Sequence, residues 1–324
     1  MAILKSLLAA AATGTVLFAA AMPAARAAWP DHAVKVIVSL PPGSGADTTA
    51  RFISKYLSQE LGQPFIVENR PGANSFIAAR AVAEAPPDGY TMFVASNSPM
   101  VTNAAVFRKL PYDPVKSFAP VASIARFPMV LVVPGNSPYK TVQDLVTAAK
   151  AAPGKLNYAS GTPTYQVAIE RFHERNGITA NPIQYKGTSP AINDLAGGTV
   201  DYSIAEVSAV TPLIHAGKLR ALAVASDTRL KELPQTPTVS EAGTRGYEAY
   251  AWTGVYFPAN TPAAIVDKVA DLVHKALASA EGAAFIHNLG GIVFTGTPAQ
   301  FREFQVKEIE ATRQIVKTAH IPVE

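Results

Sequence analysis

The chain of 324 residues contains no cysteine. This absence excludes thiolate nucleophiles, cysteine-ligated zinc and disulfides together. Charged residues are also few, at 16% of the chain against 48% hydrophobic residues, which excludes a disordered tail protein and a coiled coil. A chain of this length and composition is expected to form a packed globular structure of two domains.

Long apolar runs are confined to the N-terminus. Lys5 precedes an uncharged run, and Ala25-Arg26-Ala27 has the small residues that a signal peptidase reads. We therefore expect residues 1–27 to be a cleaved signal peptide; the alternative, an uncleaved membrane anchor, is disfavoured because Pro23 interrupts the run. Removing these 27 of 324 residues leaves 297 and lowers the formal charge from +4 to +2. So small a charge, without an arginine cluster, gives no reason to expect nucleic acid as a partner.

The mature chain alternates short β-rich runs with helical segments, which is typical of an α/β fold with mainly parallel sheets. The predicted strands span 34–40, 65–68, 90–95, 129–133, 156–159, 183–185, 200–204, 219–225 and 254–257. Two apolar segments, 118–134 and 252–258, are expected to cross between the domains, because a chain that leaves a domain and returns needs two crossings. Helix starts are predicted at Thr141, Thr261 and Thr297, whose hydroxyls are suited to capping.

Four turns rich in glycine and hydroxyl residues each follow a predicted strand and precede a predicted helix. They span residues 41–48, 70–75, 160–164 and 186–190. Such turns present backbone N–H groups at a helix N-terminus, where an anion is favoured. Ordinary helix capping explains any single turn, but four of them could converge on one cleft outside the carboxyl ends of the strands.

The four turns carry few positive side chains, of which Arg70 and Lys186 are the clear ones. A bound carboxylate would therefore depend mostly on neutral donors: backbone N–H groups, hydroxyls and bridging water. Asp47 contradicts this picture, because an acid repels an anionic ligand. Either it stabilises the first turn of its helix or it contributes to binding through a water or a ligand cation.

Sequence motifs for catalysis and for cofactors are missing. Gly43-Ser44-Gly45 begins like a dinucleotide fingerprint, but Thr48 stands at the third glycine position, and neither a Walker lysine nor a G-x-S-x-G elbow occurs. The six histidines are scattered without metal-ligand spacing. We therefore predict no catalytic residue, no metal and no cofactor. A secreted α/β hydrolase is the alternative, which needs a base within hydrogen-bond reach of a serine.

An ordered series of short motifs resembles the extracytoplasmic solute-binding proteins of tripartite tricarboxylate transporters, the Bug or TctC-like receptors. The matching stretches run in the family's order over nearly the whole mature chain. They are residues 40–51, 67–73, 87–91, 153–158, 185–187, 194–198, 217–224 and 237–243.

The resemblance implies a type II periplasmic binding-protein fold, in which two Rossmann-like lobes enclose a ligand cleft and two segments cross between them. Domain 1 would span 28–127 plus 251–324, and domain 2 would span 128–250. The protein would be a monomeric periplasmic receptor, not an enzyme, that captures a small organic acid and delivers it to membrane permease subunits. A ligand sensor feeding a two-component system is the alternative.

The resemblance, the turns and the departures from the family pattern together predict ligand-binding residues in both lobes. They are Pro42, Gly43, Ser44, Asp47, Gly72, Ala73, Asn74, Ser96, Asn97, Ser98, Gly161, Thr162, Thr164, Tyr165 and Glu206. The third turn departs from the family, because Pro163-Thr164-Tyr165-Gln166 replaces a Gly-Ser with a following His. Ala205-Glu206 likewise replaces an Asp followed by Asn. We hypothesise that Tyr165 is an aromatic wall and that Glu206 recognises a polar or cationic ligand group; a solvated acid at a strand end is the alternative for Glu206.

Overall fold

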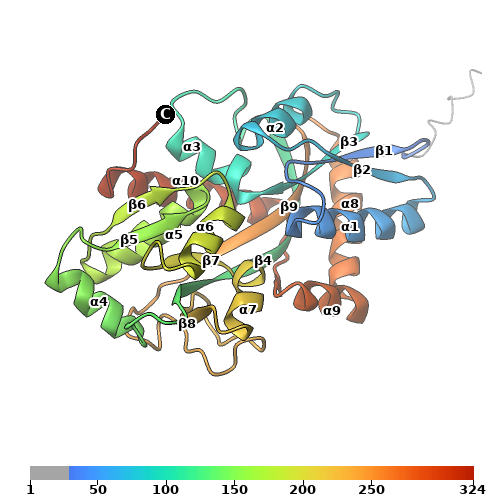
Figure 1. The fold of residues 1–324 in the computed structure, drawn as a ribbon. Helices are drawn as coiled ribbons and strands as arrows, with labels where there is room; N and C mark the ends of the chain where they lie inside the picture. The colour runs from blue at the N-terminus through green and yellow to red at the C-terminus, as the bar shows by residue number, and fades with distance from the viewer. Residues whose placement is uncertain (1–28) are drawn as a thin grey trace, which may run out of the picture.

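The structure, a computed structural model, describes residues 29–324 (Figure 1). The predicted signal peptide lies outside the described residues. Within residues 29–324, the helices all fall short of the length and apolar character that a membrane span needs. The described chain forms two lobes joined by a pair of long strands, β4 (Phe118–Pro134) and β9 (Tyr250–Pro258).

The first lobe is built on a sheet with the strand order β10-β4-β9-β3-β1-β2. Its central strand β1 (Val34–Val38) pairs in parallel with β2 (Phe65–Asn69) and β3 (Thr91–Ser96). The edge strand β10 (Ile292–Val293) pairs antiparallel with β4. The sheet is apolar on both faces, which explains why its strands are hydrophobic on successive residues.

Helices cover both faces of this sheet (Figure 1). α1 (Gly45–Leu61) and α8 (Ala263–Ala278) pack in one apolar cluster, while α2 (Phe76–Ala83) and α10 (Pro298–Thr318) belong to a second cluster with Ile37 of β1. The lobe also contains η1 (Ala73–Ser75), η2 (Ser98–Thr102), α3 (Asn103–Val106) and α9 (Ala280–Asn288). α8 buries Val266, Val269, Leu272, Val273 and Ala276 on the face that packs in the first cluster.

The second lobe lies between the two long strands in the sequence. It contains α4 (Val142–Ala151), β5 (Asn157–Ser160), α5 (Pro163–Asn176), β6 (Asn181–Gln184), α6 (Thr188–Ala196), β7 (Ser203–Glu206), α7 (Val207–His215) and β8 (Leu219–Val224). β5 and β6 pair in parallel, whereas β7 and β8 both pair antiparallel with the end of β4.

Strand β4 connects the two lobes without a break. Its residues 118–128 pair with β9, and its residues 129–134 pair with β7 and β8. The prediction of a separate strand over 129–133 was therefore too short, because both apolar stretches of the segment belong to one strand of 17 residues. The prediction of mainly parallel sheets was also wrong, since β4 and β9 make every one of their pairings antiparallel.

The predicted helix starts are confirmed at two of three threonines. Thr141 and Thr297 each form a capping box. Thr261 does not cap α8: its hydroxyl donates to the carbonyl of Pro258 at 2.8 Å, and Pro262 is the N-cap residue.

Candidate functional site

Each of the four predicted turns lies between a strand and a helix, two in each lobe. The first leads into α1 and the second into α2, both in the first lobe; the third leads into α5 and the fourth into α6. Two of these helices are capped by their own hydroxyl residues, because Ser44 accepts from the Asp47 N–H and Thr162 accepts from the Tyr165 N–H. No side-chain cap is present at the N-termini of α2, α6 and α7, within the described chain. No side chain of residues 29–324 therefore occupies the first-turn N–H groups of α2 and α6, which favours an anion there, whereas α7 begins at the acidic N-cap residue Glu206.

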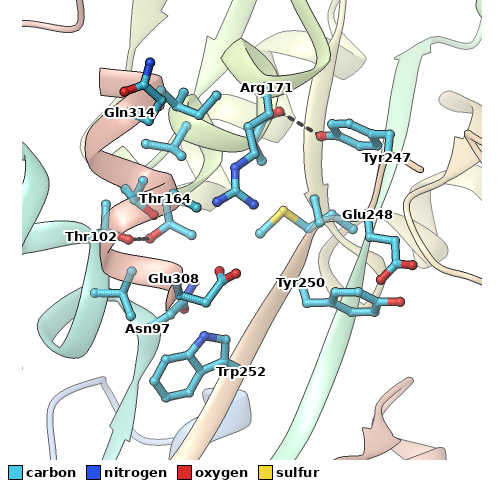
Figure 2. A pocket seen from close by; sticks show the side chains of 18 of the residues that line it. Asn97, Thr102, Thr164, Arg171, Tyr247, Glu248, Tyr250, Trp252, Glu308 and Gln314 are labelled. Carbon is cyan, nitrogen blue, oxygen red and sulfur yellow. Dashed lines mark hydrogen bonds between the residues drawn. The ribbon is translucent and has the colours of Figure 1, made fainter. Parts of the chain in front are cut away.

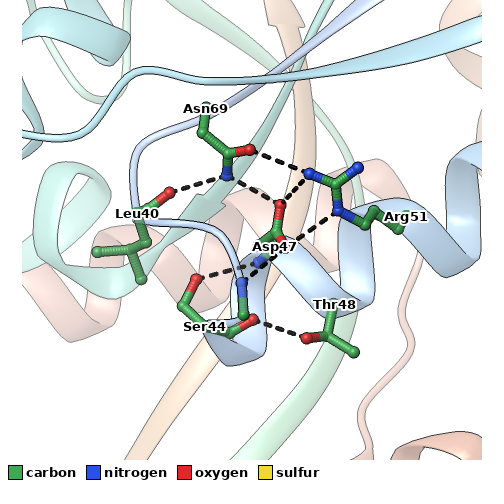
Figure 3. Close-up of polar contacts among 7 residues, drawn as sticks. Leu40, Ser44, Asp47, Thr48, Arg51 and Asn69 are labelled. Carbon is green, nitrogen blue, oxygen red and sulfur yellow. Dashed lines mark hydrogen bonds and ion pairs between the residues drawn. The ribbon is translucent and has the colours of Figure 1, made fainter.

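Asp47 organises the first turn through its polar contacts (Figure 3). The residue is 2% exposed, and its carboxylate accepts from the Gly43 N–H at 2.9 Å, from Asn69 Nδ2 at 2.8 Å and from the Arg51 guanidinium at 3.0 Å. Asn69 also donates to the carbonyl of Leu40 at 3.0 Å. These contacts support the helix-stabilising interpretation of Asp47. Its role in ligand binding stays a prediction.

The second turn has an unusual backbone. Gly72, Ala73, Asn74 and Ser75 have consecutive positive φ angles of 113°, 44°, 50° and 71°. For a residue with a Cβ this region costs about 1 kcal/mol or more, so other contacts must hold the turn. One such contact is the bond from Asn103 Nδ2 to the carbonyl of Asn74 at 2.7 Å. Gly72, Ala73 and Asn74 are exposed, so their groups are accessible to a ligand.

Two buried hydroxyls lie at the carboxyl ends of neighbouring strands. Ser39 follows β1, Ser96 ends β3, and both Oγ atoms lack a hydrogen-bond partner within the described chain. An unsatisfied buried hydroxyl is costly and marks a place where a water or ligand would be stabilised. Ser96 was predicted as a ligand residue. Ser39 was missed, although this hydroxyl residue lies between the end of β1 and the first turn.

The two lobes touch at the start of α5. The hydroxyl of Thr164 lies 2.9 Å from that of Thr102 and 3.3 Å from that of Ser98. The structure therefore brings together Ser98 and Thr164, which were predicted from opposite lobes. Thr102 was not predicted, because its place in η2 depends on how the chain folds after Asn97.

A second group of predicted residues meets inside the second lobe. Tyr165, at 6% exposed, lies close to the carboxyl of Glu206 and to Thr188. Gly161 lies so close to the fourth turn that a Cβ there would stand 2.7 Å from the carbonyl oxygen of Gly187. The third turn, the fourth turn and the end of β7 thus form one wall. Thr188 was missed as a site residue, although the fourth turn was identified.

Burial dominates the electrostatics of this wall. Burial raises the pKa of the Glu206 carboxyl above its usual value, and the hydrogen bond from Tyr165 opposes that shift. Glu206 is therefore not a fully solvated strand-end acid. Burial, followed by the neighbouring Glu206 charge, raises the pKa of Tyr165, so its hydroxyl remains a neutral donor.

The remaining predicted residues lie in the turns or directly after a strand. Pro42 and Gly43 precede α1, and Asn97 is buried at the start of η2. Residues 29–324 contain no cluster of three histidine, aspartate or glutamate side chains able to hold a metal ion. The described groups can hold a ligand through neutral donors and helix N-termini.

Known proteins similar to this chain fall in one class. The family model described as the tripartite tricarboxylate transporter family receptor matches residues 49–321. Protein BugT of Bordetella pertussis is 32% identical over 300 residues, which cover 92% of this chain and 92% of BugT. A protein from the tcbD-tcbE intergenic region of Pseudomonas sp. strain P51 is 34% identical over 293 residues, covering 89% of this chain and 87% of that protein.

Solved structures agree with the architecture. An R. palustris protein solved with adipate has a TM-score of 0.81 and 35% identity, covering 91% of this chain and 99% of its own. MatC from Rhodopseudomonas palustris, with bound malate, has a TM-score of 0.76 and 30% identity, covering 89% of this chain and 99% of its own. The predicted two-lobed periplasmic binding-protein fold and the predicted family resemblance are confirmed.

Proposed function

The chain belongs to the tripartite tricarboxylate transporter receptor family, and from that premise we propose that it binds a small carboxylate between its lobes. Members of this family are receptors, and the protein is accordingly a receptor and not an enzyme. The observation that carries the proposal is the pair of uncapped helix N-termini at predicted turns, α2 in the first lobe and α6 in the second. A dicarboxylate could place one carboxylate at each of them.

Neutral donors suit this ligand. Uncapped N–H groups and buried hydroxyls stabilise an anion through dipoles, so a basic pocket is unnecessary. The similar proteins with adipate and with malate hold dicarboxylates, and this supports the same ligand class here. Glu206, which lies close to Tyr165, would then meet a donor group of the ligand, such as a hydroxyl or an ammonium.

We assign the ligand cleft to the space between two discontinuous domains, 28–127 plus 251–324 and 128–250. Support comes from the crossing strands, where Phe127 is paired with Ala251 and the partners of β4 change from β9 to β7 two residues later. Closure of the lobes about these strands would bury the ligand.

We further propose that residues 1–27 direct the chain to the periplasm, where it acts as a monomer. There it would deliver its ligand to the membrane permease subunits of a tripartite tricarboxylate transporter. The family description, a receptor of such transporters, supports this role.

The variant Thr188→Asp tests the carboxylate site. Thr188 is the first residue of α6, where an aspartate is favourable for the helix but repels an anionic ligand. In wild-type protein, adipate or malate at a hundredfold excess over Kd should stabilise the fold by about 2.7 kcal/mol. We expect Thr188→Asp to keep the melting temperature of the free protein and to lose this shift.

Thr141→Asp is the matched control. Thr141 caps α4 and is not part of any predicted turn, so the same change there should leave the ligand-induced shift intact. If Thr188→Asp responds to dicarboxylates as fully as wild type, α6 does not hold the ligand and the proposed site is wrong.

A further inference from the structure

A cavity of about 490 Å³ lies beside the proposed cleft (Figure 2). Its walls are one face of α5 in the second lobe and one face of α10 in the first lobe, and β4 and β9 contribute the residues between them. Of the predicted ligand residues, only Asn97 and Thr164 line it. The volume is typical of a site for a small molecule.

A buried donor without a partner belongs to the wall of this cavity. Trp252 is 2% exposed, and its Nε1 has no hydrogen-bond partner within the described chain. Native proteins rarely leave such a group unsatisfied, because it costs about 1–3 kcal/mol. Asn97 also lines the cavity, and its amide atoms, which are not fully buried, make no side-chain hydrogen bond to any residue of 29–324.

Opposite charges face the cavity from the two lobes. Arg171 of α5 and Glu308 of α10 are both half-buried, and Figure 2 shows their charged ends reaching into the same space. Within residues 29–324, neither side chain forms an ion pair within 4.0 Å or a side-chain hydrogen bond. A half-buried charge without a partner is unfavourable, so both groups would be stabilised by a ligand that matches them.

A second guanidinium, that of Arg126, is held by aromatic rings. It lies 3.7 Å from the ring centroid of Phe294 and 5.1 Å from that of Phe304. Stacking of this kind leaves the in-plane N–H groups available for an acceptor. The half-buried charges lining the cavity are thus two arginines and one glutamate.

We propose that this cavity is a second binding site, for a small molecule that carries both carboxylate and ammonium groups, as acidic amino acids do. A carboxylate pairs with Arg171, the ammonium pairs with Glu308, and Asn97 and Arg126 offer donors to a further carboxylate. A ligand without an ammonium leaves Glu308 unpaired. Because Arg171 and Glu308 belong to different lobes, the occupant joins the lobes and is coupled to their closure.

The test uses Trp252 as a local reporter. The chain has two tryptophans, so Trp29→Phe leaves Trp252 as the sole indole. In this background we expect L-glutamate to change the fluorescence of Trp252, and glutarate, which has the same carbon chain without the amino group, to act only at concentrations at least tenfold higher. Arg171→Gln and Glu308→Gln should each shift the midpoint for L-glutamate at least tenfold upward.

Three controls separate this site from the proposed cleft. Glu310→Gln and Arg313→Gln remove exposed charges of α10 that do not line the cavity, and should leave the midpoint unchanged. Thr188→Asp should also keep the L-glutamate response, because it obstructs only the cleft. Midpoints within twofold of the parent for both Arg171→Gln and Glu308→Gln, or equal midpoints for L-glutamate and glutarate, would overturn the proposal.

Discussion

Asp47 shows how one buried carboxylate shapes the first turn. Burial by itself would raise its pKa, but hydrogen bonds from Arg51, Gly43 and Asn69 outweigh burial and lower the pKa below 3.8. The charged form is therefore favoured in the folded state. An acid with a lowered folded-state pKa contributes stability above its unfolded pKa, and this stability is lost as the pH falls through the folded pKa.

Asp47→Asn should therefore destabilise the protein by about 1–3 kcal/mol at pH 7, because charged hydrogen bonds are replaced by weaker ones. The difference from wild type should shrink as the pH falls below 3.8. Urea unfolding at a series of pH values measures it. Asp267→Asn, at an exposed position of α8, serves as the control and should have little effect. An Asp47→Asn effect that stays constant down to pH 3 would argue against an ionic role.

The pKa of Glu206 shifts in the opposite direction to that of Asp47. Its pKa is raised from 4.5 by burial, so the ionised form is unfavourable in the free protein. The loss of folding stability from ionising the buried Glu206 is absent below the pKa of the unfolded state. It grows as the pH rises through the folded-state pKa and persists above it.

Glu206→Gln should therefore melt at a higher temperature than wild type at pH 8 and at the same temperature at pH 4. Thermal unfolding at the two pH values tests this, with exposed Glu60→Gln as the control. A calorimetric titration of the same variant tests its role in binding: unchanged ligand affinity removes Glu206 from the site.

At the scale of elements, β9 and α10 fit together only because residue 254 is glycine. A Cβ at Gly254 would overlap the ring of Phe301. Gly254→Ala should cost about 1–3 kcal/mol through overpacking. The double variant Gly254→Ala, Phe301→Leu should cost less than the two single changes summed, since the smaller side chain leaves room.

Chemical denaturation of the single and double variants measures this coupling. Gly197→Ala is the matched control, because an added Cβ there meets no neighbouring atom closer than 3.5 Å. Additive effects of Gly254→Ala and Phe301→Leu would mean that the strand and helix adjust independently.

Prediction from sequence succeeded where the signal is local. The capping boxes of Thr141 and Thr297 lie within four residues, and the four turns follow directly from strand-turn-helix order. Prediction failed where pairing with a strand distant in the sequence determines the local structure. The residue pattern between Val121 and Val133 does not predict that one strand continues through Arg126 to Pro128. The backbone there is extended because it pairs with β9.

At the scale of the whole molecule, residues distant in sequence create the features that sequence reasoning missed. The meeting of Thr102 with Thr164 joins two lobes, and the cavity between Arg171 and Glu308 joins α5 with α10. Tyr165 and Glu206 were both singled out from the sequence, yet their proximity depends on the packing of α5 against β7. Such contacts leave no periodic signal in the chain.

The central claim is that the two lobes close on a small carboxylate. Calorimetric titration of the mature protein with adipate and with malate tests it most directly. We predict saturable binding of at least one of them at one molecule per chain in the cleft, abolished by Thr188→Asp and retained by Thr141→Asp. The absence of binding heat and of any thermal stabilisation with either acid and with other mono- and dicarboxylates would contradict the account.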